Sequence, residues 1–290
     1  MSTFVLVGLL AGLGWAFLGG DEHSRLSRPG DAPSAATRDE AKDGAGGNRT
    51  GALPLRGTTV VLDPGHNPGN KDHPEEINRH VAIGDGTKEC DTTGTATEDG
   101  YAEAAFTLAL TKQVSRVLTA RGAEVVWTHG SPHGRHGDLP YGPCIDERAA
   151  RGNHAGADAA LSLHADGAPA DARGFHVIMP GRVHAEEADT RSIVAPSARL
   201  GRAVAKGYRS ATHARPATYI GAGDGLDTRT DLGGLNLSRV PKVFLECGNM
   251  RNAADAAHFT SSAWRERAGT GIANGLTRYL TARHAPGQRR

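Results

Sequence analysis

Short apolar segments alternate with longer helical patterns along most of this chain, and this alternation constrains the fold more than any other feature. The apolar segments are bounded by Gly, Pro, Asp or His, as buried parallel strands often are; they are residues 58–62, 124–128, 159–163, 175–179 and 242–245. Helical spacing of apolar side chains is found in residues 101–121, 144–157, 192–212 and 261–283. The alternation predicts a single α/β domain with a mostly parallel central sheet flanked by helices.

The N-terminal region has a different composition from the rest of the chain. Residues 4–20 carry no charged side chain, and their length lies between a signal-peptide core and a short membrane span. Residues 21–56 are too poor in apolar side chains to build a core, which disfavours a buried helix just before them. We therefore predict export, with a signal peptide or membrane anchor over 1–20, a disordered linker over 21–56, one globular domain over 57–283 and a frayed tail over 284–290.

Charge and cysteine content narrow the possible partners and cross-links. The net charge of +1 gives no electrostatic basis for binding nucleic acid. Cys90, Cys144 and Cys247 allow at most one internal disulfide. A Cys90–Cys144 bond would fasten the long, apolar-poor segment 67–100 to the body of the domain and contribute about 3–4 kcal/mol in the chain-entropy model. Two free cysteines are the alternative, which export disfavours. Cys247 should remain a free thiol.

Side chains that suit a metal or acid–base chemistry follow three of the predicted strands. His66 follows the first strand by way of an Asp-Pro-Gly turn, His164 directly follows the third strand, and Glu246 directly follows the fifth. Ligands of open α/β sheets bind just beyond the carboxyl ends of the strands. We therefore expect these three side chains to meet at one edge of the sheet.

Glu103 is expected to join them from a helix. It lies in the first turn of the helix predicted over residues 101–121, on the same face as Phe106 and Leu110. That face should pack on the sheet, and the helix should begin at the carboxyl edge of the strands. The helix dipole favours a carboxylate at this position.

Two histidines and one carboxylate are a frequent ligand set of catalytic zinc, and a further carboxylate can act as general base and then general acid. Glu246 is the candidate for that second role. Each residue alone has a plainer interpretation: the chain has 14 histidines, Glu103 suits a helix start, and Glu246 could pair with an arginine. Their occurrence together at strand ends favours a metal hydrolase, because burying such groups unpaired costs several kcal/mol.

Four segments resemble the signatures of a known family. They are VVLDPGHNPGN, YAEAAF, ALSLHADG and FLECGNMRN. Together they are similar to the zinc-dependent N-acetylmuramoyl-L-alanine amidases of the type 3 class, over about residues 58–280. Three further features are especially similar to actinobacterial members, here with a single catalytic domain: the stretch GPCIDERAARGN, residues 217–249, and the Cys90–Cys144 pair.

The resemblance implies a specific activity. The family hydrolyses the amide between N-acetylmuramic acid and L-alanine in peptidoglycan, so the substrate would be peptidoglycan or a muropeptide. The zinc ligands would be His66, Glu103 and His164, with one Zn²⁺ per chain, and Glu246 would be the catalytic glutamate. A cell-wall location and a role in wall remodelling or cell separation are also implied. We see no obvious partner face and expect a monomer.

Three residues near these signatures receive supporting roles. Asp63 either hydrogen-bonds a ligand histidine or caps the turn at Pro64 and Gly65, and we favour the cap. Asn249 stands where the family often has an aromatic or apolar residue, and we expect Asn249 and Asn252 to line the substrate groove. The segment 67–100 lies between two ligands in sequence and should border the metal. A zinc peptidase or deacetylase acting on another wall amide, and a non-catalytic regulator that binds the wall, are the alternative functions.

Overall fold

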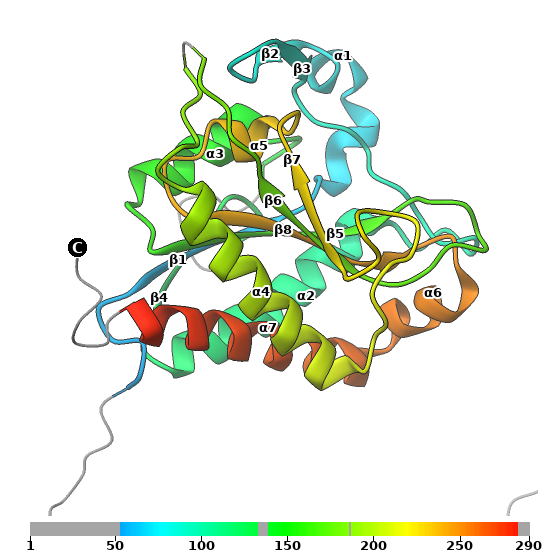
Figure 1. The fold of residues 1–290 in the computed structure, drawn as a ribbon. Coiled ribbons are helices and arrows are strands. Elements are labelled where there is room, and N and C mark those ends of the chain that lie inside the picture. The colour runs from blue at the N-terminus through cyan, green and yellow to red at the C-terminus, as the bar shows by residue number, and fades with distance from the viewer. Residues whose placement is uncertain (1–52, 133–138, 186, 284–290) are drawn as a thin grey trace, which may run out of the picture. The chain divides into compact units, whose positions relative to one another are not determined.

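A six-stranded sheet forms the centre of the molecule, in the strand order β4-β1-β5-β8-β6-β7 (Figure 1). We describe residues 53–132, 139–185 and 187–283 of a computed structural model. The strands are β1 (Thr59–Pro64), β4 (Glu124–Trp127), β5 (Ala159–Asp166), β6 (His176–Pro180), β7 (Leu226–Arg229) and β8 (Lys242–Asn249). β4, β1, β5 and β8 run parallel, while β6 is antiparallel to β8 and parallel to β7. The predicted α/β domain with a mostly parallel sheet is confirmed.

All of the predicted strands are present, and the structure adds an edge strand, β7. This strand has the sequence LDTR and only one apolar residue, Leu226, which is half-buried. An edge strand needs less apolar surface than a central one, so the pattern that marks a buried strand is missing here. The four predicted helices correspond to α2 (Glu103–Ala120), α3 (Ile145–His154), α4 (Val194–Thr212) and α7 (Ser262–Arg283). Two short helices, α5 (Gly233–Asn236) and α6 (Ala253–Thr260), were not predicted.

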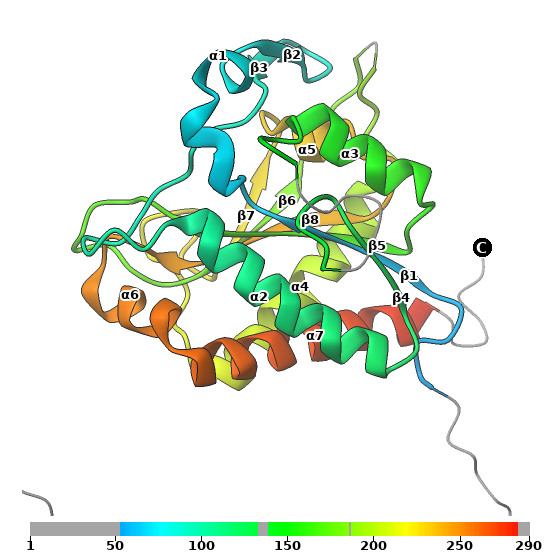
Figure 2. The same cartoon turned by 180° about the vertical axis from the view of Figure 1, so that it is seen from behind.

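The two faces of the sheet have different characters because side chains alternate along each strand. On one face, Leu161 and Leu163 of β5 and Leu245 of β8 are buried in the main hydrophobic core. Helices α2, α4 and α7 cover this face, as the two opposite views show (Figures 1 and 2). On the other face, the same strands present His164 and Glu246. The sheet thus separates an apolar core from a polar surface.

The segment 67–100 covers part of the polar face together with α3 and α5 (Figure 2). It is ordered and contains a 3₁₀ turn, η1 (Pro68–Asp72), a short helix, α1 (Pro74–Ile77), and a hairpin of β2 (His80–Ala82) and β3 (Thr87–Glu89). The predicted disulfide is present and joins Cys90 of this segment to Cys144, which caps α3. Cys247 is buried and free, as predicted.

The described residues include both boundaries predicted for the globular domain. Leu55 is fully buried in the main core, so the fold begins slightly before the predicted boundary at residue 57. Helix α7 ends at Arg283, the last described residue. The predicted signal peptide or anchor, most of the linker and the tail lie outside the described residues. Among the helices that are described, none combines the length and apolar character needed to cross a membrane.

Candidate metal centre

His66, Glu103 and His164 meet at the carboxyl edge of the sheet, as predicted. The Nε2 atom of His66 lies 3.2 Å from Oε2 of Glu103, and Nδ1 of His164 lies 2.9 Å from Oε1 of the same carboxylate. One ligand atom from each residue lies within 4.8 Å of the other two. The imidazole rings are nearly perpendicular, with centroids 4.9 Å apart. The three side chains therefore converge on a single point.

Glu103 is held as an ionised carboxylate at the start of α2. It is buried, and its two oxygens accept hydrogen bonds from the backbone N–H groups of Thr95 and Ala165. Burial alone would raise its pKa, but His66 and His164 hold the pKa of this carboxyl well below its usual range. The hydrogen bond from Thr95 also brings the segment 67–100 against a candidate ligand.

The donor set fits a divalent metal ion such as zinc. Burial would lower the pKa of His66, but the carboxylates of Glu103 and Asp91 outweigh it and raise this pKa to about 10. A positive charge is therefore favoured where the imidazole nitrogens of His66 and His164 face Glu103. A metal cation at this point would supply that charge to the Glu103 carboxylate, and the two imidazole nitrogens would then not need to be protonated. Two imidazole nitrogens and one carboxylate oxygen are a common three-ligand set for catalytic zinc.

Two glycines let the backbone pass against the ligands. A Cβ atom on Gly65 would lie 2.4 Å from Cε1 of His164, and one on Gly94 would lie 2.7 Å from Cδ2 of His66 and 2.8 Å from Oε2 of Glu103. Such distances are too short for any side chain. The rings of His66 and His164 are therefore packed directly against main chain, which limits their movement.

Glu246 stands beside the candidate ligands on the polar face of the sheet. It is the register partner of His164, and in-register neighbours point to the same face. The carboxylate is half-buried, and in the described part of the chain it has neither a hydrogen bond nor an ion pair. The pairing with arginine considered above is therefore not formed. Burial, followed by the nearby carboxylates Glu103 and Asp166, raises the pKa of Glu246 well above its usual value.

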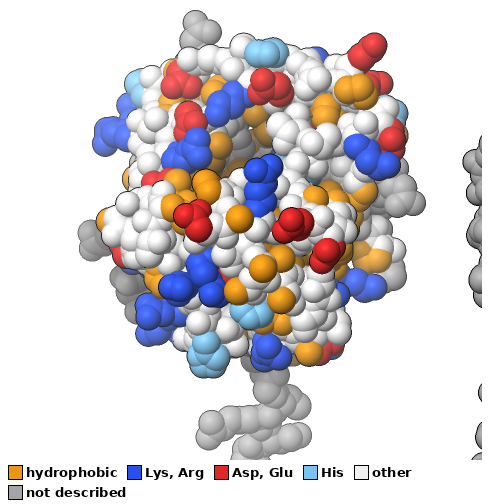
Figure 3. Space-filling view, turned by 90° about the vertical axis from the view of Figure 1, so that its right-hand side faces the viewer, with side chains coloured by type: hydrophobic (Ala, Val, Ile, Leu, Met, Phe, Trp, Pro, Cys, Tyr) orange, Lys and Arg blue, Asp and Glu red, His pale blue; other side chains and the backbone are white. Residues whose placement is uncertain are grey.

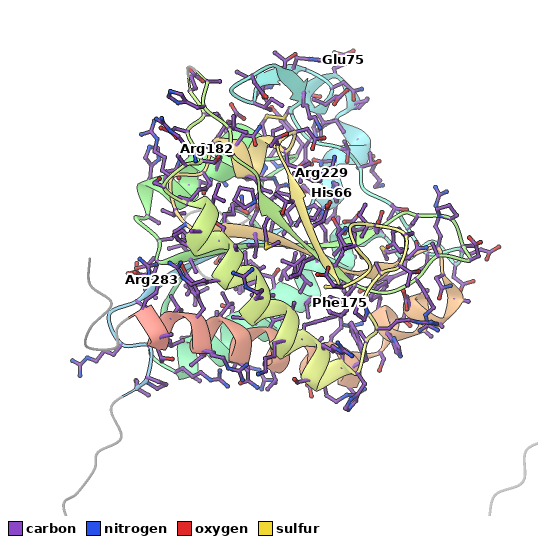
Figure 4. The ribbon with its side chains drawn as sticks, viewed as in Figure 1. His66, Glu75, Phe175, Arg182, Arg229 and Arg283 are labelled. Carbon is purple, nitrogen blue, oxygen red and sulfur yellow. A yellow bond between two sulfur atoms is a disulfide. The ribbon has the colours of Figure 1, made fainter. Side chains whose placement is uncertain are left out.

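A cavity of about 260 Å³ lies next to His66 and His164. Its walls include Phe244, Ile145 and the glycine pair at 233–234, with Lys88 of the hairpin also contributing. The ring of His164 stacks on Phe244 with an interplanar angle of 2°. Figure 3 shows the surface hollowed on the side of the molecule where Figure 4 places His66 and Arg229. A larger hollow of about 830 Å³, lined by Asn153 and Ser238 among others, is formed without any of the candidate site residues.

Comparison with known proteins identifies the family. A family model described as N-acetylmuramoyl-L-alanine amidase matches residues 60–278. The chain belongs to the N-acetylmuramoyl-L-alanine amidase family. The amidase Rv3717 of Mycobacterium tuberculosis is 37% identical over 228 residues, which cover 78% of this chain and 88% of that protein.

Solved structures of family members show the same architecture. The amidase Ami1 from Mycobacterium smegmatis has a TM-score of 0.68 and 40% identity, covering 79% of this chain and 99% of its own. The apo form of Ami1 from Mycobacterium abscessus has a TM-score of 0.68 and 41% identity, covering 78% of this chain and 100% of its own. The predicted family and fold are thus confirmed.

The structure corrects the role predicted for Asp63 in this member of the amidase family. Asp63 is buried, and its carboxylate accepts hydrogen bonds from Thr128, Ser162, Arg148 and Lys242. It therefore neither contacts a ligand histidine nor caps the turn after β1. The reason is that Asp63 lies within β1, which extends to Pro64, so its side chain points into a buried ionic cluster beneath the ligands.

The roles predicted for Asn249 and Asn252 are also wrong. Asn249 is fully buried, and its Nδ2 group donates to the carbonyls of Pro169 and Ala172. Asn252 is the N-cap of α6, where its Oδ1 atom accepts hydrogen bonds from the backbone N–H groups of residues 254 and 255. Its Nδ2 group donates to the carbonyl of Ala170. Both asparagines hold the loop after β5 instead of lining a groove.

Sequence reasoning missed the residues on the outer side of His66. Nδ1 of His66 lies 3.0 Å from the carbonyl oxygen of Thr92 and 3.4 Å from Oδ1 of Asp91. Asp91 in turn receives a hydrogen bond from the buried guanidinium of Arg148. The signal available in the sequence was the position of Asp91 and Thr92 directly after Cys90, since a disulfide to Cys144 draws this stretch towards α3.

Proposed function

We propose that this chain is a zinc-dependent amidase that hydrolyses the bond between N-acetylmuramic acid and L-alanine in peptidoglycan. The observation that carries the proposal is the meeting of two histidines and a carboxylate beside Glu246. Glu246 is the register partner of His164, and among the described residues its carboxylate has no hydrogen bond or ion pair. Family membership supports the amide bond as the target, because the related mycobacterial proteins carry the name of this activity.

We assign one zinc ion to His66, Glu103 and His164. When bound, zinc supplies a Lewis acid that polarises the amide carbonyl and makes water more acidic. The Glu246 carboxylate takes the proton of the attacking water and then delivers it to the departing L-alanine nitrogen as the C–N bond breaks. The raised pKa of Glu246 suits the first step, because a carboxylate with a higher pKa is the better base.

We also propose an extracytoplasmic, cell-wall location for the protein, with a role in wall remodelling or cell separation. The disulfide between Cys90 and Cys144 is consistent with an oxidising compartment. The N-terminal apolar run would act as a signal peptide or membrane anchor. The catalytic domain would act as a monomer and bind muropeptides through the cavity beside His66 and His164.

Mass spectrometry of digested muropeptides tests this function. The full chain should release free stem peptides and intact glycan from purified muropeptides, and a chelator should abolish the release. Cleavage within the stem peptide would instead identify a peptidase, and loss of acetyl groups a deacetylase. Zinc-loaded protein that binds muropeptides without cutting them would identify a non-catalytic regulator.

We expect zinc affinity to rise with pH. The metal-binding nitrogen of His66 must be unprotonated, whereas the metal-free protein holds that proton with a pKa of about 10. Release of one proton should increase the association constant about tenfold per pH unit between about pH 7 and about pH 9. Without metal, the same raised pKa stabilises the fold at low pH, and this contribution is lost as the pH rises through about 10. Chelator competition across this range measures the slope, and a flat profile would contradict it.

Replacing Gly65 by alanine should damage the zinc site without removing a ligand. The new Cβ atom would lie 2.4 Å from Cε1 of His164, so the ring must move away. A shift of about 1 Å can cost about 10²-fold in rate, and we expect a loss of that order in stem-peptide release. Gly86→Ala is the control, because a Cβ atom there has no heavy atom within 4 Å. Equal activity of the two variants would show that contact with Gly65 does not hold His164.

A further inference from the structure

A short strap of three residues, 90–92, orients the imidazole of His66 from its outer side. Nδ1 of His66 lies 3.0 Å from the carbonyl oxygen of Thr92 and 3.2 Å from its Oγ1 atom. With a hydrogen on Nδ1 that is donated to this carbonyl, Nε2 keeps its lone pair towards Glu103. This is the arrangement that a metal-binding histidine requires, and it depends on the position of the strap.

Several independent bonds fix the strap to the rest of the domain. The disulfide ties Cys90 to Cys144, and the backbone N–H of Ile145 donates to the carbonyl of Cys90 over 2.8 Å. Asn70 donates to the carbonyl of Thr92 over 2.7 Å. Arg148 binds the carboxylate of Asp91 through Nη2 at 2.7 Å. Among these contacts, the one between Arg148 and Asp91 is the ion pair.

Arg148 also holds the backbone of His66 itself. Its Nη2 atom donates to the carbonyl of His66 over 3.2 Å, and its Nη1 atom donates to the carbonyl of Pro64 over 2.7 Å. His66 has a left-handed backbone, with φ of 59°, a conformation that is uncommon for a residue with a Cβ atom. One guanidinium thus restrains both the main chain of His66 and the strap that orients its ring.

Arg148 pairs with two carboxylates, those of Asp63 and Asp91, and the two differ in what else they contact. The carboxylate of Asp63 also pairs with Lys242, whose Nζ atom lies 3.1 Å from Oδ2. Asp63 therefore keeps a cationic partner if Arg148 is lost. Asp91 is the other carboxylate on Arg148, and it contacts His66 directly at 3.4 Å. The two carboxylates share one arginine, but only Asp91 touches a candidate ligand.

We propose that Arg148 is a positioning residue for the metal ligand His66, acting through the carboxylate of Asp91 and the carbonyl of His66. The proposal rests on the zinc site of the proposed function. It requires the planar fork of arginine, because its N–H groups reach Asp91, Asp63 and three backbone carbonyls at the same time. A lysine at this position has a single ammonium group and cannot span these partners.

The matched pair Asp91→Asn and Asp63→Asn tests the proposal. Each removes one carboxylate charge from Arg148, but only the first alters a group in contact with His66. We expect Asp91→Asn to weaken zinc binding about 10–100-fold, as is usual for groups that orient a ligand histidine. Asp63→Asn should change zinc affinity by less than about threefold, well below the loss expected for Asp91→Asn. Affinity is measured on the full chain by chelator competition.

A second variant, Arg148→Lys, and the absorption spectrum of the Co²⁺-loaded protein separate an effect on the metal site from an effect on the stability of the fold. Arg148→Lys keeps the charge and should weaken zinc binding about tenfold or more. The d–d absorption of the Co²⁺-loaded protein should change in Arg148→Lys and Asp91→Asn and remain unchanged in Asp63→Asn. Val204→Ala, a cavity variant in α4 within the main core, controls for a lower melting temperature with an intact site.

The outcomes are distinct. Wild-type zinc affinity and an unchanged cobalt spectrum in both Asp91→Asn and Arg148→Lys would overturn the positioning role alone. The positioning role would also be overturned if Val204→Ala, at the same loss of melting temperature, lost as much zinc affinity as Asp91→Asn. A wild-type chain that binds no zinc would overturn the proposed function, and the positioning role with it.

Discussion

Glu246→Gln should lower the rate of stem-peptide release by about 10²–10⁴-fold, the usual contribution of a general acid–base group. The amide has nearly the shape of the carboxylate but cannot take a proton from water. Glu246 has neither a hydrogen bond nor an ion pair among the described residues, so the substitution breaks no contact of the fold. We therefore expect zinc content and melting temperature close to those of the wild type, which removes misfolding as an explanation for lost activity.

Glu266→Gln is the matched control for this experiment. Glu266 is an exposed glutamate on α7, the helix that packs on the apolar side of the sheet. It should retain full activity. Release of stem peptide by Glu246→Gln at the rate of this control would remove Glu246 from the reaction, even if the wild-type enzyme still needed zinc.

His164→Ala should strongly weaken zinc binding and abolish activity. His164 supplies one of the three donor atoms, and its ring fills the space between Gly65 and Phe244. A zinc binding free energy on the order of 10 kcal/mol, shared among three ligands, implies a loss of affinity on the order of 10²–10³-fold for one ligand. Zinc content after dialysis and the rate of stem-peptide release measure the two effects.

The control for His164→Ala is His154→Ala. His154 is exposed at the end of α3, so its loss should change neither quantity. Retention of stoichiometric, tightly bound zinc by His164→Ala would show that the ion binds elsewhere in the chain. Loss of activity with unchanged zinc would instead assign His164 to the substrate.

The sheet could be predicted from the sequence because its central strands are buried and must be apolar. The same reasoning could not find β7, whose single apolar residue, Leu226, gives no strand pattern. His66, His164 and Glu246 were placed together because parallel strands end at a common edge. The position of Glu103 followed from the face that α2 presents to the sheet, with Phe106 and Leu110.

The groups that hold the ligands could not be predicted in the same way. Arg148 and Asp91 meet beside His66 only because the segment 67–100 folds back over the sheet, and no local pattern encodes that path. An asparagine after a strand is ambiguous, because its side chain can contact a substrate or form hydrogen bonds with backbone groups. Asn249 and Asn252 form hydrogen bonds with backbone groups. Asp63 was misjudged because β1 ends at Pro64, two residues after the end of its apolar run.

The unequal faces of the sheet have a consequence for protein engineering. Residues that stabilise the fold, such as Val204 on α4 and Leu276 on α7, lie in the core on the side away from Glu246. Residues beside the cavity, such as Phe244 and Ile145, lie on the opposite side. Mutations in the first group should raise or lower heat tolerance without altering which muropeptides are cut. Mutations in the second should alter the choice of muropeptide at nearly constant heat tolerance, so the two traits can be selected in separate libraries and then combined.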